Sequence, residues 1–193
     1  PYLTQDKNGN WIAEEHFPST GESVKRYRPR IEGLFARIEK IKTITDQSFY
    51  WKVTTRDNVV TFFGRTEDSR ITDPNDSSKV FKWLTDLSYD DKGNCMQFEY
   101  VSEDLKGVSV EIHEKNRLNG LATFTNKYLK RIKHGNKNPF YPEKLKPHTP
   151  ENPSNPEYFF EVVFDFGDHD SVIPTSVIQH DWKCRTDPFS DCK

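Results

Sequence analysis

Residues 49–64 read FYWKVTTRDNVVTFFG and carry the firmest structural signal in the sequence. Two runs rich in aromatic and β-branched residues, 49–55 and 59–64, flank the three turn-forming residues at 56–58. Such runs fit the pleated surface of a strand, and a short polar connection between them is typical of a hairpin. The stretch therefore predicts two antiparallel strands joined by a tight turn.

A second hairpin is predicted in residues 88–100, which read SYDDKGNCMQFEY. The aspartates, glycine and asparagine at 90–94 favour a tight reversal, because they bond to their own backbone or accept a positive φ. The alternation after the turn predicts a return strand with one face toward a core. The expected core-facing residues are Met96, Phe98 and Tyr100.

Four further runs predict strands by alternation or by enrichment in β-forming residues. They are residues 34–41, 80–87, 121–133 and 158–166. In the first run the hydrophobic side shifts between Ile38 and Ile41, which indicates a β-bulge. The period of the second run also fits a helix, and its aromatic content favours a strand.

Two parts of the chain are predicted to lack regular structure. Residues 1–30 are expected to form a weakly structured lead-in, and residues 136–157 a long proline-rich surface loop that holds half of the 12 prolines. Proline removes the donor that a strand ladder needs. Because a strong strand follows the loop, we expect one β-rich unit over 1–193. The start at Pro1, without a Met, indicates a fragment of a larger protein.

The composition agrees with a sheet protein. Hydrophobic residues make up 33% of the chain and aromatic residues 13%, so a core has to rely on 14 Phe, 8 Tyr and 4 Trp. These residues fit twisted sheets better than helix bundles. The expected fold class is mainly β, with antiparallel hairpins forming a twisted sheet or a partial β-sandwich or shell, and few or no long helices.

The charge balance and the cysteines limit the classes of function. The formal net charge is -2, which gives no excess of positive charge for nucleic acid. No run of about 18 apolar residues occurs, so no membrane span is predicted. Of the three cysteines, only Cys184 and Cys192 are close in sequence. Reduced thiols are favoured, and whether these two pair stays open.

Two groups of charged residues are interpreted as solvent-exposed and not as binding sites. The most basic stretch, residues 25–30, is interpreted as a solvated approach to a strand. A second set of basic residues does not share one face of a strand and is interpreted as solvent-facing charge. Its members are Lys127, Lys130, Arg131, Lys133 and Lys137.

A cluster of oxygen-bearing side chains surrounds the second turn, namely Asp86, Asp90, Asp91 and Asn94. A calcium loop of the EF-hand type needs oxygens at alternate positions and a glycine at the sixth. Here Asp90 and Asp91 are adjacent, and Gly93 comes third after Asp90. This spacing does not predict a calcium site.

Residues 165–170 read DFGDHD and combine carboxylates with an imidazole directly after a predicted strand. A metal ion would need three or four converging ligands, and polar residues that simply end a strand explain the run. Gln97 and Glu99 match the [Gln/Glu]-x-Glu turn of ADP-ribosylating toxins. Those enzymes also need an upstream Ser-Thr-Ser strand, whereas this chain has only Ser-Thr-Gly at 19–21. Both are interpreted as solvent-facing strand residues.

Other catalytic patterns are absent from the sequence. It contains neither a Gly-x-Ser-x-Gly elbow nor a glycine-rich phosphate loop. We therefore predict no catalytic, cofactor-binding or metal-binding residues, no cofactor, and no enzymatic activity.

A resemblance to a known family is carried by residues 27–39, YRPRIEGLFARIE. They resemble the YRPR-EGLFARIE stretch of the SpvB-type virulence B proteins, which include the B components of insecticidal Tc toxin complexes. Further blocks follow in family order: WKVTTRDN at 51–58, FGRT at 63–66, SYDDKGN at 88–94, NKYLKRI at 126–132, FEVVFDFG at 160–167 and DPFS at 187–190.

The resemblance implies a part of a larger assembly. In the family this region is β-rich and belongs to a shell of Rhs/YD-type strands, so we expect a non-catalytic structural segment of a secreted bacterial toxin. The shell would enclose or present a toxic domain. The expected partners are other domains or components of the toxin complex. The family's ADP-ribosyltransferase activity belongs to a separate domain whose sequence elements are not found in this chain.

An alternative is a binding module on the same β-scaffold. Exposed aromatic residues would then hold a carbohydrate or a host protein. The residues considered for this role are Trp11, Trp51, Trp83 and Trp182. Burial in a core is the commoner fate of a tryptophan, which favours the structural hypothesis.

Overall fold

A computed structural model describes most of the chain. The described residues are 1–19, 21–31, 33, 35–45, 48–106, 108, 110, 112, 115–119, 124–142, 156–173 and 175–181. Their strands are β1 (Leu3–Gln5), β2 (Trp11–Ala13), β3 (Glu15–Ser19), β4 (Glu22–Tyr27), β5 (Arg37–Thr43), β6 (Phe49–Thr54), β7 (Val60–Phe63), β8 (Arg70–Asp73), β9 (Asp76–Trp83), β10 (Thr85–Tyr89), β11 (Cys95–Ser102), β12 (Lys127–Asn136) and β13 (Tyr158–Val163).

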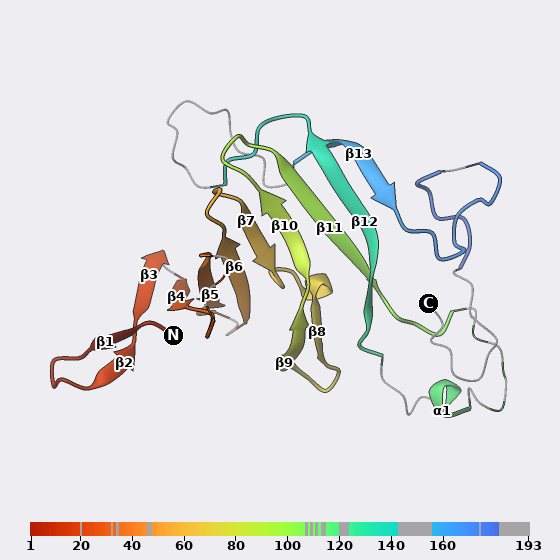
Figure 1. Ribbon diagram of the computed structural model, residues 1–193. Coiled ribbons are helices and arrows are strands. Elements are labelled where there is room, and N and C mark those ends of the chain that lie inside the picture. The colour runs from red at the N-terminus through yellow and green to blue at the C-terminus, as the bar shows by residue number, and fades with distance from the viewer. Residues whose placement is uncertain are drawn as a thin grey trace.

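Nine of these strands form one antiparallel sheet, in the order β13-β12-β11-β10-β7-β6-β5-β4-β3 (Figure 1). The pairs β1–β2 and β8–β9 form two separate hairpin sheets. The helical elements of the described residues are the single turns η1 (Glu67–Ser69) and α1 (Lys115–Leu118). The predicted fold class, mainly β with antiparallel hairpins and no long helix, is confirmed. No helix in the described part of the chain is long and apolar enough to cross a membrane.

The predicted central hairpin is confirmed as β6–β7. Trp51 pairs with Phe63 and Thr54 with Val60. Asn58 adopts the positive φ of 59° that the reversal requires, and Thr55 N donates to Val59 O at 2.9 Å. The local turn chemistry of this segment therefore specifies its structure.

The predicted strand at 80–87 is a strand, but it is divided between two sheets. β9 pairs with β8, and after Leu84 the chain continues as β10 in the main sheet. The division arises at Gly64, whose φ is +69° and whose missing Cβ would lie 2.3 Å from Cδ1 of Trp83. Gly64 N donates to Leu84 O at 2.8 Å, and Leu84 N donates to Ser69 O at 2.8 Å. Figure 1 shows the β8–β9 hairpin projecting from the main sheet.

The hairpin at 88–100 is confirmed as β10–β11. Asp90 accepts hydrogen bonds from the backbone N–H groups of Lys92 and Asn94 at 3.0 and 2.9 Å, which closes the turn. Gly93 has a φ of +87°, and an added Cβ would lie 2.8 Å from Cβ of Pro139. The residue at this position therefore has to be a glycine.

The core lies on one face of this hairpin, and it corrects the expected inward face. Its buried residues are Val60, Leu87, Tyr89, Cys95 and Phe140. Cys95 pairs with Tyr89 and is 2% exposed, whereas Met96 is 41% exposed. Phe98 and Tyr100 are half-buried. The prediction for Met96 was wrong because the core covers the face of β11 that carries Cys95.

The prediction that residues 1–30 form a weakly structured lead-in was also wrong. They contain β1 to β4, and β3 and β4 belong to the main sheet. β4 pairs with β5 from Glu22↔Thr43 to Tyr27↔Ile38, so its order comes from pairing with a later segment rather than from local pattern. Part of the basic run 25–30 thus lies inside a strand.

The bulge expected between Ile38 and Ile41 does not form. β5 pairs with β4 and β6 in an unbroken register. The apolar pattern is interrupted because Glu39 occupies a buried position beside Ile41. Arg26 and Arg37 contact its carboxylate at 3.5 and 3.4 Å. Paired charges therefore replace an apolar residue on the inner face of this strand.

The proline-rich loop of 136–157 is only partly described, since residues 143–155 lie outside the described residues. Its first part is not a free surface excursion. Phe140 is buried in the core, and Asn136 accepts a hydrogen bond from Cys95 N at 2.9 Å and donates to Gly93 O at 2.8 Å. The strands predicted at 121–133 and 158–166 correspond to β12 and β13. Residues 121–123 lie outside the described part.

Candidate functional site

A buried ion cluster joins β12 to the segment that follows β13. The side chain of Lys130 on β12 is buried, with the residue 3% exposed, and Asp168 and His169 are buried beside it. Lys130 Nζ donates to both carboxylate oxygens of Asp168 at 2.8 and 2.7 Å, and to Phe164 O at 2.9 Å. This corrects the interpretation of Lys130 as solvent-facing charge.

The hydrogen bonds of the cluster also assign the tautomer of His169. Lys130 Nζ lies 2.9 Å from His169 Nε2, and His169 Nδ1 lies 3.0 Å from Val177 O. An ammonium group can only donate and a carbonyl can only accept. These two contacts fit a His169 that accepts at Nε2 and donates from Nδ1, with one of the three Lys130 protons shared between two of its four acceptors. The cluster holds the segment after β13 against the sheet. Its charged and polar side chains form hydrogen bonds with one another.

The DFGDHD run therefore has a structural role in the described residues. Asp165 accepts hydrogen bonds from Gly167 N and Asp168 N at 2.7 and 3.1 Å, so it closes a turn after β13. These bonds hold the pKa of Asp165 below its ordinary value, with the bond from Gly167 contributing most. Among the residues described here, no three His, Cys, Asp or Glu side chains are grouped so that they could hold a metal ion.

The polar residues around the second turn separate into two unrelated sets. Asp90 closes the β10–β11 turn, whereas Asp86 is buried and accepts hydrogen bonds from Arg65 N and Thr66 N at 2.9 and 3.2 Å. The other carboxylate oxygen of Asp86 is buried without a hydrogen-bond partner in the described structure. Burial raises the pKa of Asp86, and the Arg65 guanidinium opposes this shift.

The raised pKa of Asp86 predicts a pH-dependent stability. Its pKa in the fold lies above the ordinary value of 3.8, so its contribution is fully present below that pH and is lost as pH rises through the folded-state pKa. Asp86→Asn lacks this titration. We expect the wild type to gain stability relative to Asp86→Asn as the pH is lowered from neutral towards 3.8, measured by urea unfolding.

The exposed Asp91 provides the matched control for this measurement, because Asp91→Asn removes one charge from the same hairpin. A constant difference in unfolding free energy between the wild type and Asp86→Asn across the pH series would contradict the assignment.

The other residues that the sequence analysis considered, Glu99 and the four tryptophans, do not form a shared site in the described residues. Glu99 pairs with Lys133 at 2.6 Å, as a cross-strand ion pair between β11 and β12. Trp83 Nε1 donates to Phe49 O at 3.3 Å, and its ring packs edge-on against Trp51 with centroids 6.1 Å apart. Trp11 lies on β2 with 67% exposure, and Trp182 lies outside the described residues. The tryptophans thus give no common binding surface among the residues described.

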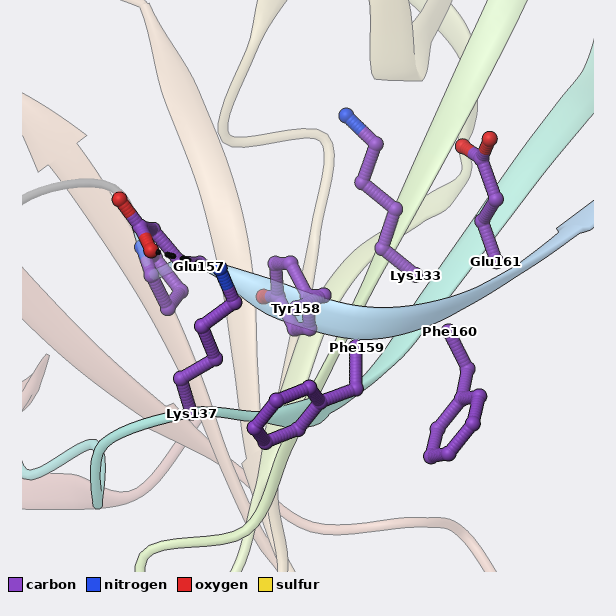
Figure 2. A pocket seen from close by; sticks show the side chains of 8 residues that line it. Lys133, Lys137, Glu157, Tyr158, Phe159, Phe160 and Glu161 are labelled. Carbon is purple, nitrogen blue, oxygen red and sulfur yellow. Dashed lines mark hydrogen bonds and ion pairs between the residues drawn. The ribbon is translucent and has the colours of Figure 1, made fainter.

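An exposed aromatic surface lies instead on β13, at one end of the main sheet. Phe159 and Phe160 are 66% and 62% exposed. Figure 2 shows both rings extending to one side of β13, with Lys133 and Glu161 on the other. An open hollow is formed here by residues of β12, β13 and the chain beside them. Its lining residues are Lys133, Lys137, Pro156, Glu157, Tyr158, Phe159, Phe160 and Glu161.

The two phenylalanines are held in place although they are exposed. The Phe160 ring stacks on His134 with centroids 5.5 Å apart and lies over Gly135, where an added Cβ would be 2.8 Å from Cδ2 of Phe160. The Phe159 and Phe160 centroids are 6.3 Å apart. Lys137 pairs with Glu157 at 3.0 Å beside them. We call Phe159 and Phe160 the aromatic surface of β13.

The sequence run at 158–166 predicted this strand but not its exposure. An apolar run is expected in a buried strand. Which of its sides meets another layer depends on the order of strands in the sheet, and no local signal gives that order.

Comparison with known proteins places this fold in a family. All 193 residues match the family model described as "SpvB: Salmonella virulence plasmid 65kDa B protein". The chain belongs to the SpvB family. The family predicted from the ordered sequence blocks is thereby confirmed.

Curated relatives in this family are much longer than the chain. The mono(ADP-ribosyl)transferase SpvB of Salmonella typhimurium (strain 14028s) is 28% identical over 171 residues, which are 87% of this chain and 28% of that protein. The SpvB proteins of Salmonella enteritidis and Salmonella dublin give the same identity and coverage. The chain thus spans less than a third of the length of these relatives.

Solved structures share the fold. The N-terminal domain of effector protein SpvB from Salmonella typhimurium strain LT2 has a TM-score of 0.74 at 24% identity, covering 95% of this chain and 58% of that one. TcdB2-TccC3 without its hypervariable C-terminal region gives 0.74 at 22%, covering 95% and 9%. The Photorhabdus luminescens Tc holotoxin pore gives 0.72 at 23%, covering 92% and 9%. The fold of this chain therefore recurs in the N-terminal domain of SpvB and in chains of Tc toxin complexes.

Proposed function

We propose that this SpvB-family chain is a non-catalytic structural and assembly segment of a secreted bacterial toxin, and that it contributes to a β-shell that encloses or presents a toxic domain. The observation that supports this proposal is that more hydrophobic side chains are exposed to solvent than are buried. Seven hydrophobic side chains are buried in the described residues, whereas twenty large ones are exposed. Five of the exposed residues lie on strands of the main sheet, and three of these, Phe159, Phe160 and Val162, gather on β13. Apolar residues gathered at one edge of a sheet call for another layer or another part of an assembly against them.

Two further observations support the proposal. Matching solved structures include the N-terminal domain of SpvB and parts of Tc toxin assemblies. The clusters that resemble chemical sites in the sequence are occupied by structural contacts, since Asp90 and Asp165 close turns and Lys130 neutralises Asp168. The partners would be other domains or components of the toxin, and the place of action extracellular.

Deleting this segment from the complete toxin tests the proposal. We expect the deleted toxin to fail to assemble, measured by size-exclusion chromatography and electron microscopy, and its toxic domain to become sensitive to protease. The isolated toxic domain should keep its activity, which controls for damage to the enzyme. Unchanged assembly and protease resistance would refute the structural role. NAD hydrolysis above background by the pure chain would refute the non-catalytic part.

A further inference from the structure

The two ends of the nine-stranded sheet differ in how their edges are treated. β3 and β13 are the edge strands. An open edge presents unpaired N–H and C=O groups, and natural proteins obstruct such edges with proline, charge or covering segments.

The β3 edge is obstructed. Pro18 lies within β3, where it removes a donor, and the β3–β4 register is broken between His16 and Ser19. Beside it, Tyr2 N donates to Arg26 O of β4 at 2.8 Å. The Arg28 guanidinium lies 4.3 Å above the Tyr2 ring. The N-terminal segment thus occupies part of this edge.

The β13 edge is less obstructed in the described residues. Its residues YFFEVV contain no proline and a single charged residue, Glu161, which is paired with Arg131. In the described part of the chain no strand pairs on its outer side. Phe159, Phe160 and Val162 are all exposed. A run of β-forming residues with little charge and an open backbone is suited to receive another strand.

The surroundings of β13 limit where pairing can occur. Arg131 Nη2 donates to Ser176 O at 2.5 Å, so the chain that follows β13 returns close to the Arg131–Glu161 ion pair. The aromatic surface lies toward the other end, near Lys137 and Glu157 (Figure 2). Among the described residues, the end of β13 that begins at Tyr158 is therefore the less covered one.

We propose that this end of the β13 edge pairs with an extended segment of the same toxin polypeptide outside residues 1–193, and that apolar side chains of that segment cover the aromatic surface of β13. The proposal rests on the proposed function and names the contact through which the segment joins the rest of the toxin. Backbone pairing supplies affinity in this mode of recognition, and the two rings supply the apolar contact.

Two features favour a segment of the same polypeptide as the occupant. The main sheet is built by pairing strands in chain order, from β3 to β13 with the β8–β9 hairpin as the one excursion in the described sheet. Relatives also contain more chain than this one, which covers 58% of the solved SpvB N-terminal domain and 28% of a curated SpvB protein. A second copy of the chain and a separate component are the competing occupants.

Hydrogen exchange in the complete toxin tests whether the edge is paired. We expect consecutive amides of Tyr158–Val163 to be as protected as those of the interior strand β12. Phe160→Lys should raise exchange rates at least tenfold in β13 and leave β12 unchanged. The matched control is Phe81→Lys, which changes an exposed phenylalanine on β9 away from this edge. Rapid exchange at alternate β13 amides in the wild-type toxin would overturn the proposal.

A photo-crosslinking amino acid in place of Phe159 identifies the occupant. The expected product is a crosslink within one polypeptide, to a peptide outside residues 1–193. A crosslink to a second copy of the chain or to another toxin component would overturn the proposal. The absence of any crosslinked product would also overturn it. These outcomes are separable from the proposed function, because a toxin that needs this segment for assembly but leaves β13 exchanging rapidly would refute only the edge pairing.

Discussion

Lys130→Met is expected to lower the free energy of unfolding by about 3–5 kcal/mol, the largest effect of any single substitution proposed for this chain. Lys130 is the cation that neutralises the buried carboxylate of Asp168 at 2.7 Å. Without it, Asp168 stays buried beside acceptors, and His169 Nε2 and Phe164 O lose their shared donor. The carboxylate of Asp168 would become hydrated only if the segment after β13 detached from the sheet.

Lys133→Met is the matched control, because Lys133 lies on the same strand and also pairs with a carboxylate. Its ion pair with Glu99 is partly exposed, with side chains 32% and 35% accessible. We expect a loss of at most about 1 kcal/mol there. Urea unfolding of the two variants under identical conditions measures both effects. Equal losses would show that burial of Lys130 does not set its contribution.

A second variant keeps this prediction testable if Lys130→Met does not fold. In Lys130→Met/Asp168→Leu both buried charges are removed, and replacement of a buried pair by apolar residues is often close to neutral. We expect the double variant to be more stable than Lys130→Met alone. The recovery should be partial, because Asp168 also accepts a hydrogen bond from Phe166 N at 3.1 Å. A double variant less stable than the single one would contradict the account.

Gly64→Ala is expected to cost about 3 kcal/mol, since it combines a positive-φ strain of about 1–2 kcal/mol with overpacking of about 1–3 kcal/mol. The added Cβ would lie 2.3 Å from Cδ1 of Trp83. That ring cannot move freely, because it packs on Trp51 and Phe49 with centroids 6.1 and 5.0 Å apart. The substitution therefore disturbs the point where the β8–β9 hairpin leaves the main sheet.

Gly9→Ala measures the loss of stability that comes from the positive φ alone, without overpacking. Gly9 has a φ of +82° with nothing within 4 Å of its missing Cβ, so only the strain of about 1–2 kcal/mol applies. Thermal or urea unfolding compares the two variants, and tryptophan fluorescence reports on Trp83. A loss at Gly64 no larger than that at Gly9 would show that Trp83 yields at no cost.

The parts of the fold that the sequence predicted are those specified by neighbouring residues. The hairpins β6–β7 and β10–β11 are recognisable because Asn58 and Asp90 provide the turn chemistry within each segment. The strands within 1–30 were missed for the opposite reason. β4 is ordered by its pairing with β5, and nothing within its own sequence signals that partner.

The same distinction explains the errors about side chains. Lys130 looks like any basic residue of a polar strand, and its partner Asp168 lies 38 residues further along the chain. Its burial is decided by how the segment after β13 returns to the sheet. Met96 was assigned to the core because alternation identifies two faces but not which of them is covered. The openness of β13 is likewise a property of strand order.

The departure of the β8–β9 hairpin at Gly64 has a consequence for how sequences of this fold can change length. β7 and β10 pair directly with each other, so the chain between them leaves the sheet and returns to the same place. Residues inserted at the tip, near Pro74 and Asn75, lengthen a side branch and shift no register of the main sheet. The hairpin is thus a position where related proteins can acquire new surface, or an engineer can graft a reporter, while the strand pairing of the main sheet stays unchanged.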